Sequence, residues 1–325
     1  MINYQDLILQ NKQFKELCNQ EINCNSFLFE SRDELFLENF SYCYAQRLLC
    51  TNNSYKPCKT CIQCQKVTLL KHSDLHIYPK NNKSILVEDI KDLIENINLT
   101  PVESDIKVFI LNNFSSATVQ AQNKLLKILE EPPKNTYIFL NVTNINKVLP
   151  TIISRCKKNR LLPLSKNEIK SILKNYSNDK IEAVIDICQG SLTKAMNYIE
   201  NEDFSKIYKS CLNTLSNMQD SRKLIKYANL FNSNKKHFEI ALEIFESIFR
   251  DVLMLRLKKS ELVENKNIIN ELINIAQLLD ADAVDLLIKK IYSIKKQIEF
   301  NCNYVLLIDN FLLYYLEVKY LCNKK

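Results

Sequence analysis

Residues 122–165 read QNKLLKILEEPPKNTYIFLNVTNINKVLPTIISRCKKNRLLPLS, and the fold can be predicted outward from this stretch. Its first part continues an apolar pattern of helical spacing, which predicts a helix over 117–131. Pro132 and Pro133 cannot continue a helix and therefore end it. The run TYIFLNV (136–142) then combines aromatic and β-branched residues, as buried strands do. A helix leading directly into a strand is the repeating unit of a parallel α/β sheet.

The first half of the chain repeats this alternation. Short apolar runs predict further strands, and the segments after them have helical periodicity. The predicted strands are 26–31, 75–78 and 107–112, and the predicted helices are 33–49 and 87–99. We therefore expect a mostly parallel sheet covered by helices.

The second half is expected to be helical. All seven prolines lie at or before Pro163, and Ser165 with Glu168 forms a capping-box pattern that starts a helix. The amphipathic pattern of 241–257 is typical of a helical bundle. The predicted domains are an α/β domain over 1–163, a helical unit over 164–205 and a helical bundle over 206–325.

Composition sets the broad class. The chain has 325 residues, 46% of them hydrophobic and 25% charged, as in ordinary globular proteins. No apolar run is long enough to predict a membrane span, and the first residues lack the basic region of a secretory signal. We therefore expect a cytoplasmic protein with reduced cysteines. A net charge of +7 permits contact with nucleic acid without requiring it.

Helix, Glu-Glu-Pro-Pro, strand and then Ser-Arg-Cys in 122–165 resemble the AAA+ clamp-loader proteins of bacteria. The four cysteines of 50–64 and the segment LKHSDLHIY (70–78) add to the resemblance, which covers about the first 200 residues with recognisable motifs. It implies an α/β AAA+-type domain with a zinc-binding loop, a helical lid and an all-α C-terminal collar that joins subunits into a ring.

The phosphate-binding loop of that family should follow the first strand, where this chain reads ESRDELFL (30–37). A phosphate cradle uses glycines, whose backbone N–H groups converge on the anion, and a lysine. The only glycine of the chain is Gly190, and 30–37 holds acidic groups in place of a lysine. The degenerate loop is near Glu30, Ser31, Arg32, Asp33 and Glu34.

Two further motifs of ATP hydrolysis are absent. Asn112 and Asn113 stand where an acidic pair would hold magnesium, and an amide lacks the charge of that aspartate. Thr193 stands where the resemblance places a sensor arginine. We therefore expect that the chain binds no ATP and is not an enzyme on its own. The resemblance implies an accessory, non-hydrolysing subunit of the DNA polymerase III holoenzyme.

Cys50, Cys58, Cys61 and Cys64 have C-x7-C-x2-C-x2-C spacing. Four thiolates suit tetrahedral Zn²⁺, and a closed four-sulfur site is structural. An iron–sulfur cluster is a rival because C-x2-C-x2-C opens one ferredoxin motif, although that motif's fourth cysteine is missing here. Scattered reduced thiols are the third interpretation. The other eight cysteines fit no ligand spacing and are expected to be small buried residues.

Arg155, within Ser154-Arg155-Cys156, is one of only seven arginines among 44 basic residues. A guanidinium offers a planar set of donors that suits phosphoryl oxygens. The resemblance implies that Arg155 reaches ATP held by a neighbouring subunit as an arginine finger. The alternative is a surface arginine at a helix end.

The resemblance implies a subunit that completes the clamp-loader ring. Its partners would be ATPase subunits of the gamma/tau type, the delta subunit and, through the assembly, the sliding clamp and primed DNA. Lys124 and Lys127 are candidate DNA phosphate contacts. Two other hypotheses stay open: a zinc-dependent nucleic-acid-binding module on an AAA+ body, which would bind DNA alone, and an active AAA+ ATPase, which would bind ATP tightly.

Overall fold

The structure is a computed structural model that describes residues 4–52, 56–80, 84–174, 176–218, 224–229, 231 and 234–323. Its residues form two compact units. The first comprises Met1–Ile172 together with Gly190–Thr193, and the second comprises Leu173–Gln189 and Lys194–Lys325. Among the described residues, no helix combines the length and the apolar character needed to cross a membrane. The predicted three-domain division at 163 and 205 stays a prediction.

A five-stranded parallel sheet organises the first unit. Its strands are β1 (Ser26–Glu30), β2 (Leu75–Tyr78), β3 (Lys107–Leu111), β4 (Thr136–Val142) and β5 (Lys157–Arg160), in the order β2-β3-β4-β1-β5. All four strand pairs are parallel, so the expected parallel sheet and α/β fold class are confirmed. Four of the strands match the predicted runs, whereas β5 was not predicted.

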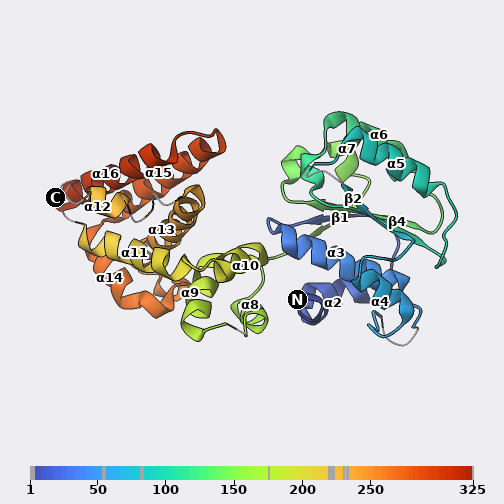
Figure 1. Cartoon of the computed structure of the whole chain (residues 1–325), viewed down its shortest axis with the longest axis horizontal. Helices are drawn as coiled ribbons and strands as arrows, with labels where there is room; N and C mark the ends of the chain where they lie inside the picture. The colour runs from blue at the N-terminus through green and yellow to red at the C-terminus, as the bar shows by residue number, and fades with distance from the viewer. Residues whose placement is uncertain are drawn as a thin grey trace. The chain divides into compact units, whose positions relative to one another are not determined.

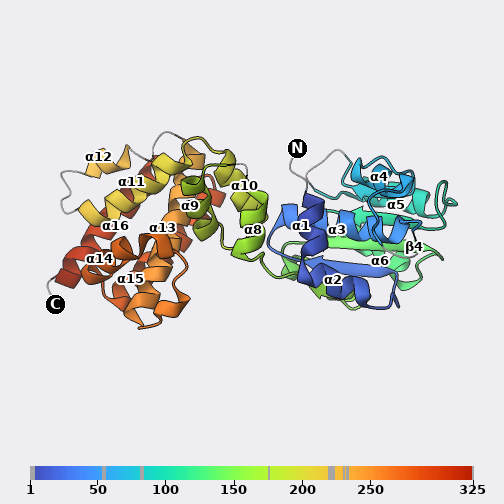
Figure 2. The ribbon, with the colours of Figure 1, turned by 90° about the horizontal axis from the view of Figure 1, so that it is seen from below.

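Helices cover both faces of the sheet (Figure 1). One face carries α3 with α1, α2 and α4 beside it, as Figure 2 also shows, and the other carries α5, α6 and α7. The bounds of these helices are α1 Tyr4–Gln10, α2 Lys12–Asn19, α3 Glu34–Leu49, α4 Ile62–Thr68, α5 Val87–Ile97, α6 Val119–Glu130 and α7 Pro150–Ile153. Two 3-10 turns, Phe114–Ser116 and Ile145–Lys147, complete the connections.

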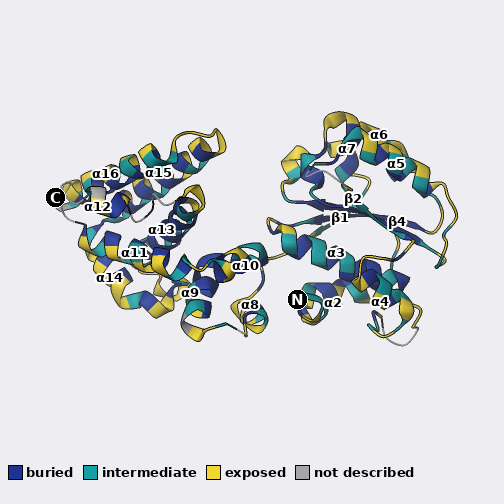
Figure 3. Ribbon diagram, viewed as in Figure 1, coloured by how far each residue is buried: buried dark blue, intermediate teal, exposed yellow. Residues whose placement is uncertain are grey.

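The alternation of side chains along β1 divides the core into two layers. Phe27 and Phe29 point to the α3 face, where their rings lie 5.4 and 5.9 Å from the Tyr44 ring. Leu28 belongs to the opposite layer, which α5, α6 and α7 cover. The strands are buried on both faces, and the outer helix surfaces are exposed (Figure 3). Both faces of the sheet are therefore closed, and side chains can meet solvent at the ends of the strands.

A short helix, α8 (Lys166–Ile172), ends the continuous part of the first unit. The capping box expected at its start is present: the Glu168 carboxylate accepts from the Ser165 N–H at 2.8 Å, and the Glu168 N–H donates to Ser165 Oγ at 3.3 Å.

The second unit is helical in all its described elements, as the sequence predicted. The helices are α9 Asn178–Cys188, α10 Leu192–Glu200, α11 Phe204–Asn217, α12 Leu224–Ala228, α13 Lys235–Arg256, α14 Ile269–Leu278, α15 Ala281–Glu299 and α16 Tyr304–Asn323, with 3-10 turns at Ser260–Leu262 and Lys266–Ile268. The helix α13 is central, because Ala241, Ile244 and Ile248 are fully buried. The first two residues of α10, Leu192 and Thr193, belong to the first unit and its remainder to the second.

Candidate functional site

The connection from β1 to α3 is where a nucleotide-binding protein of the AAA+ type would hold phosphate. The carboxylate of Asp33 caps α3 there and accepts from the Phe36 N–H at 2.9 Å. The Asp33 N–H donates to Ser31 Oγ at 3.2 Å. The first N–H groups of a helix attract anions because no residue of the helix itself accepts from them. In this chain the anion at that position is the protein's own carboxylate.

Thr193 completes this arrangement from a distant part of the sequence. Its N–H and hydroxyl donate to the Asp33 carboxylate at 3.1 and 2.7 Å. The Thr193 hydroxyl oxygen also accepts from the Leu35 N–H at 3.1 Å. Two N–H groups in the first turn of α3 therefore have protein acceptors. Thr193, which stands where the resemblance places a sensor arginine, binds the degenerate loop directly.

Amides occupy the ends of β3 and β4. The side chain of Asn141 donates to Asn112 Oδ1 at 2.7 Å and accepts from Ser41 Oγ at 2.6 Å. Asn112 donates in turn to the Tyr42 hydroxyl at 3.1 Å. The four side chains form one network of neutral groups, three of them buried. Its hydrogen bonds occupy the amide oxygens that a magnesium ion would need as ligands.

A small cavity lies beside this network. Its volume is about 10 Å³, and it is lined by Glu34, Leu37, Glu38, Asn113, Asn141 and Thr143. That volume is at the lower limit for one water molecule. Burial and the neighbouring Glu34 carboxylate raise the pKa of Glu38. Two acidic side chains, Glu34 and Glu38, thus line the cavity, which is unfavourable for a triphosphate.

The four cysteines of the loop come together as the sequence predicted. Cys50 follows α3, Cys61 is the N-cap residue of α4, and Cys64 lies within α4. The four Sγ atoms all lie within 4.8 Å of one another, with 4.0 Å between Cys50 and Cys61 and 3.9 Å between Cys58 and Cys64. The cluster could hold a metal ion.

Backbone N–H groups point at two of these sulfurs. The Cys61 N–H donates to Cys58 Sγ at 3.3 Å, and the Cys64 N–H donates to Cys61 Sγ at 3.4 Å. The Cys61 N–H lowers the pKa of Cys58 to about 6, with help from the Thr60 hydroxyl. Burial raises the pKa of Cys50 and of Cys64. The loop thus stabilises a thiolate at Cys58 through its own fold.

The remaining cysteines correct one expectation. Three of the eight, Cys43, Cys188 and Cys211, are buried. Four are partly exposed (Cys18, Cys24, Cys156 and Cys322), and Cys302 is exposed. The expectation that all eight would be buried is wrong. A cysteine can be buried without cost, but the position of the residue in its helix or loop decides whether it is. Cys156 of the Ser-Arg-Cys motif is partly covered, and burial raises its pKa to about 12.

Arg155 lies two residues beyond α7, on the α6 side of the sheet. Its guanidinium pairs with the carboxylate of Glu130, the last residue of α6, and Nη1 donates to the Thr151 carbonyl at 2.7 Å. The side chain is 33% exposed. The contact joins the Glu-Glu-Pro-Pro motif to the Ser-Arg-Cys motif across 25 positions of sequence. Ser154 Oγ donates to the same Thr151 carbonyl at 3.1 Å.

Lys124 and Lys127 are exposed on α6, whose buried residues include Leu125 and Leu129. The helix α6 lies on the opposite face of the sheet from α4, which carries the cysteine cluster (Figure 1), so the structure does not bring these two candidate sites together. It does bring Asp33 and Thr193 together, at a distance of 160 positions in the sequence.

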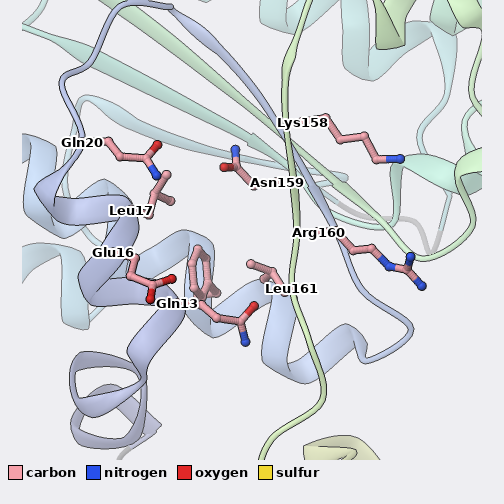
Figure 4. Close-up of a pocket in the computed structure, with 9 residues that line it drawn as sticks. Gln13, Glu16, Leu17, Gln20, Lys158, Asn159, Arg160 and Leu161 are labelled. Atoms are coloured by element: carbon pink, nitrogen blue, oxygen red, sulfur yellow. The ribbon is translucent and has the colours of Figure 1, made fainter.

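A larger cavity lies where sequence reasoning indicated nothing. It has a volume of about 260 Å³ and opens between α2 and the edge strand β5. Figure 4 shows Gln13 and Glu16 of α2, with Gln20 just after the helix, opposite Asn159 and Leu161. Lys158 and Arg160 point away from the cavity. Lys158 instead pairs with Glu30 at 3.0 Å. The cavity contains none of the predicted site residues.

Comparison with known proteins identifies the family. A family model described as DNA polymerase III, delta subunit, matches residues 9–165, and a second, described as DNA polymerase III, delta subunit, C terminal, matches residues 202–316. The chain belongs to the DNA polymerase III delta-subunit family. The resemblance to the delta-prime type of subunit is confirmed by the relatives that match.

The DNA polymerase III subunit delta' of Bacillus subtilis is 24% identical over 296 residues, which cover 89% of this chain and 90% of that protein. The delta' of Buchnera aphidicola subsp. Schizaphis graminum is 30% identical over 223 residues, or 66% of this chain and 64% of that protein. Subunit gamma of the same organism is 30% identical over 156 residues, or 45% of this chain and 42% of that protein. These two delta' proteins match a longer part of the chain than that gamma subunit does.

Among solved structures, a DNA polymerase III gamma subunit-related protein of Thermotoga maritima has a TM-score of 0.47 and 19% identity. The match covers 95% of this chain and all of that one.

Proposed function

We propose that the chain is the non-hydrolysing, delta-prime-type subunit of a replicative clamp loader. It completes the ring of subunits, binds no ATP of its own and offers Arg155 to the ATP site of a neighbouring gamma/tau-type subunit. With the delta subunit it helps to load the sliding clamp on primed DNA. It works in the cytoplasm as an accessory subunit of the DNA polymerase III holoenzyme.

The observation that carries the ATP-independent part is the carboxylate of Asp33 at the N-terminus of α3. Phosphate would need the N–H groups of Leu35 and Phe36, and these donate to Thr193 and Asp33. A triphosphate would also meet the Asp33 charge at short range, where repulsion between like charges is strong. The neutral network of Asn112 and Asn141 supports the same conclusion for magnesium.

The role of Arg155 is supported by its chemistry and its position. The guanidinium follows a short helix on the surface of the first unit and makes two contacts, both with groups on exposed positions. Exposed ion pairs are worth at most about 1 kcal/mol, so Arg155 can exchange Glu130 for a phosphoryl group of a partner at low cost. Arginine fingers in general raise hydrolysis by about 10³–10⁵-fold.

The cysteine cluster is proposed to hold structural Zn²⁺. Zn–S bonds of about 2.3 Å in a tetrahedron place the sulfurs about 3.8 Å apart. The Cys50–Cys61 and Cys58–Cys64 separations of 4.0 and 3.9 Å fit this arrangement. Cys50, Cys58, Cys61 and Cys64 would be the ligands. The ion would fix α4 and its loop to the end of α3.

The domain roles follow from the same proposal. Residues 1–163 would be the degenerate AAA+-type domain, 164–205 the lid and 206–325 the collar that joins the ring. Lys124 and Lys127, which are exposed on α6, would contact phosphates of primed DNA.

The proposal is tested by reconstituting the loader from this chain and the gamma/tau-type and delta subunits of the same source. ATP hydrolysis is followed in a single turnover, stimulated by clamp and primed DNA, with wild-type protein, Arg155→Ala and the control Arg160→Ala. Arg160 is an exposed arginine on β5. We expect normal assembly in all three and loss of the hydrolysis from one site per complex with Arg155→Ala alone. Unchanged hydrolysis with Arg155→Ala would exclude the arginine finger, and failure of the wild-type chain to assemble would exclude the clamp-loader role.

A further inference from the structure

The segment Gly190–Thr193 is tied to the first unit at two points, although the chain on both sides of it belongs to the second unit. We propose that Asp33 serves as a built-in anion, which holds this segment against the N-terminus of α3 in the place that nucleotide phosphate would otherwise take. We call the set of Asp33, Leu35, Leu164, Gly190 and Thr193 the anion latch. This inference deepens the proposed ATP-independence and rests on that part of the proposed function.

The first point is the Asp33 carboxylate, which is 6% exposed. It accepts from one N–H of α3 and from the N–H and hydroxyl of Thr193, and the Thr193 oxygen accepts from a second N–H of α3. Hydrogen bonds to a charged group are stronger than neutral ones, and Asp33 is largely buried. The carboxylate therefore joins two segments of the chain in the way that a shared phosphate would.

The second point is Gly190. Its carbonyl accepts from the Leu164 N–H at 3.0 Å, and its φ of +76° lies in the region that glycine adopts without strain. A Cβ built on Gly190 would lie 2.4 Å from the Leu164 carbonyl oxygen and 2.8 Å from Cβ of Pro163. The only glycine of the chain thus stands where this segment passes too close to residues 163–164 to leave room for a Cβ.

The two points act together on a short length of chain. Only two residues lie between Gly190 and Thr193, so the segment cannot move as a whole while both contacts hold. Thr193 is also in the first turn of α10, which starts at Leu192. The start of α10 is therefore fixed by a group that the protein always carries, and its position does not depend on binding or release of a nucleotide.

Hydrogen exchange of the full chain, followed by mass spectrometry without nucleotide, tests the anion latch. The test variants are Thr193→Val, which keeps the shape but removes the hydroxyl, and Asp33→Ala. The control is Glu34→Gln, which neutralises the adjacent exposed carboxylate. Both test variants should speed exchange in peptides covering 34–37 and 191–196 by about tenfold or more, the factor for one hydrogen bond to a charged group.

Peptides from β4 report whether the variants are folded and should exchange as in the wild type. Unchanged exchange at 34–37 and 191–196 in both test variants would overturn the latch. A second arm adds Mg²⁺ and ATP to the wild type. No effect on these peptides is expected, because the anion site is filled from within. Slower exchange with ATP would overturn both the latch and the proposed ATP-independence, whereas failure of the first arm alone would overturn only the latch.

Discussion

Glu130 restrains the proposed arginine finger, and replacing it should change hydrolysis in a way that depends on Arg155. In the structure the Glu130 carboxylate pairs with the Arg155 guanidinium, which also donates to the Thr151 carbonyl. Arg155 must leave this carboxylate to reach a phosphoryl group elsewhere. Glu130→Gln keeps the size of the side chain and removes the charge, so it should make the finger easier to release.

The expected size of the change in hydrolysis follows from the solvent exposure of the two side chains. The Arg155 and Glu130 side chains are 33% and 48% exposed, and ion pairs at such positions contribute about 0.2–1 kcal/mol. Removing the pair should therefore raise the population of released arginine by at most about fivefold. Losing the guanidinium itself should cost about 10³-fold or more at the affected site. The second effect exceeds the first by orders of magnitude, so the two roles can be separated.

The assay is single-turnover ATP hydrolysis by the reconstituted loader, at ATP concentrations below saturation. The complexes carry Glu130→Gln, Arg155→Ala or both, and Glu131→Gln serves as the matched control because it neutralises the neighbouring exposed carboxylate. We expect up to about a fivefold increase with Glu130→Gln, no change with Glu131→Gln, and the same loss in the double variant as in Arg155→Ala.

Two results would refute this reasoning. A loss with Glu130→Gln as large as that with Arg155→Ala would mean that Glu130 is required to place the finger. An increase that persists in the double variant would mean that Glu130 acts on another group.

Three further predictions follow from the structure. Elemental analysis of the purified chain should find about one zinc per molecule. The variant Cys58→Ser should lose the metal, whereas Cys302→Ser, at an exposed cysteine, should keep it. Iron or no metal in the wild type would contradict the zinc proposal. Burial alone would raise the pKa of Asp74, but the N–H groups of Val102, Glu103 and Ser104 outweigh it and the pKa is lowered. A carboxyl group whose pKa is lower in the folded than in the unfolded state stabilises the fold above about pH 4, and this stabilisation is lost as the pH falls through the folded-state pKa. The free energy of unfolding of the wild type should therefore fall more steeply with decreasing pH than that of Asp74→Asn. Equal slopes would show that the interaction contributes nothing. The double variant Lys124→Ala, Lys127→Ala should weaken binding of primed DNA by the assembled loader and reduce the slope of log K against log salt concentration by about 2. The control Lys12→Ala, Lys15→Ala on α2 should leave both unchanged. An unchanged slope in the α6 variant would remove the two lysines from the DNA interface.

The elements that sequence reasoning found are those with a strong local pattern. Strands β2 and β4 match the predicted ranges, because each is a short apolar run in a covered sheet. Strand β5 reads KKNR and has no such pattern. It lies at the edge of the sheet and pairs only with β1, so its polar side chains reach solvent and a charged sequence is tolerated. Helices α1, α2 and α4 were also missed.

The candidate site was predictable where spacing carries the information. Cys50, Cys58, Cys61 and Cys64 lie within fifteen positions, and their meeting follows from the short loop that joins them. The Asp33–Thr193 contact spans 160 positions and has no local signature. Sequence reasoning identified both positions, one as an unwanted charge and the other as a missing arginine. Only the three-dimensional structure shows that the two features satisfy each other.

The same holds for Arg155. The residue was identified by its motif, but its partner Glu130 is 25 positions away in another motif. A single sequence does not specify which of the two adjacent carboxylates, Glu130 or Glu131, would face the guanidinium. In the structure the partner is Glu130, the last residue of α6.

Nucleotide binding by the isolated chain tests the central claim most directly. Equilibrium dialysis with labelled ATP and Mg²⁺, at millimolar nucleotide, should detect no saturable binding by the wild type, because its own carboxylate and threonine occupy the N–H groups of α3. Saturable binding of one ATP per chain, abolished by mutation of the residues around Asp33, would contradict the account and identify the chain as a nucleotide-binding subunit.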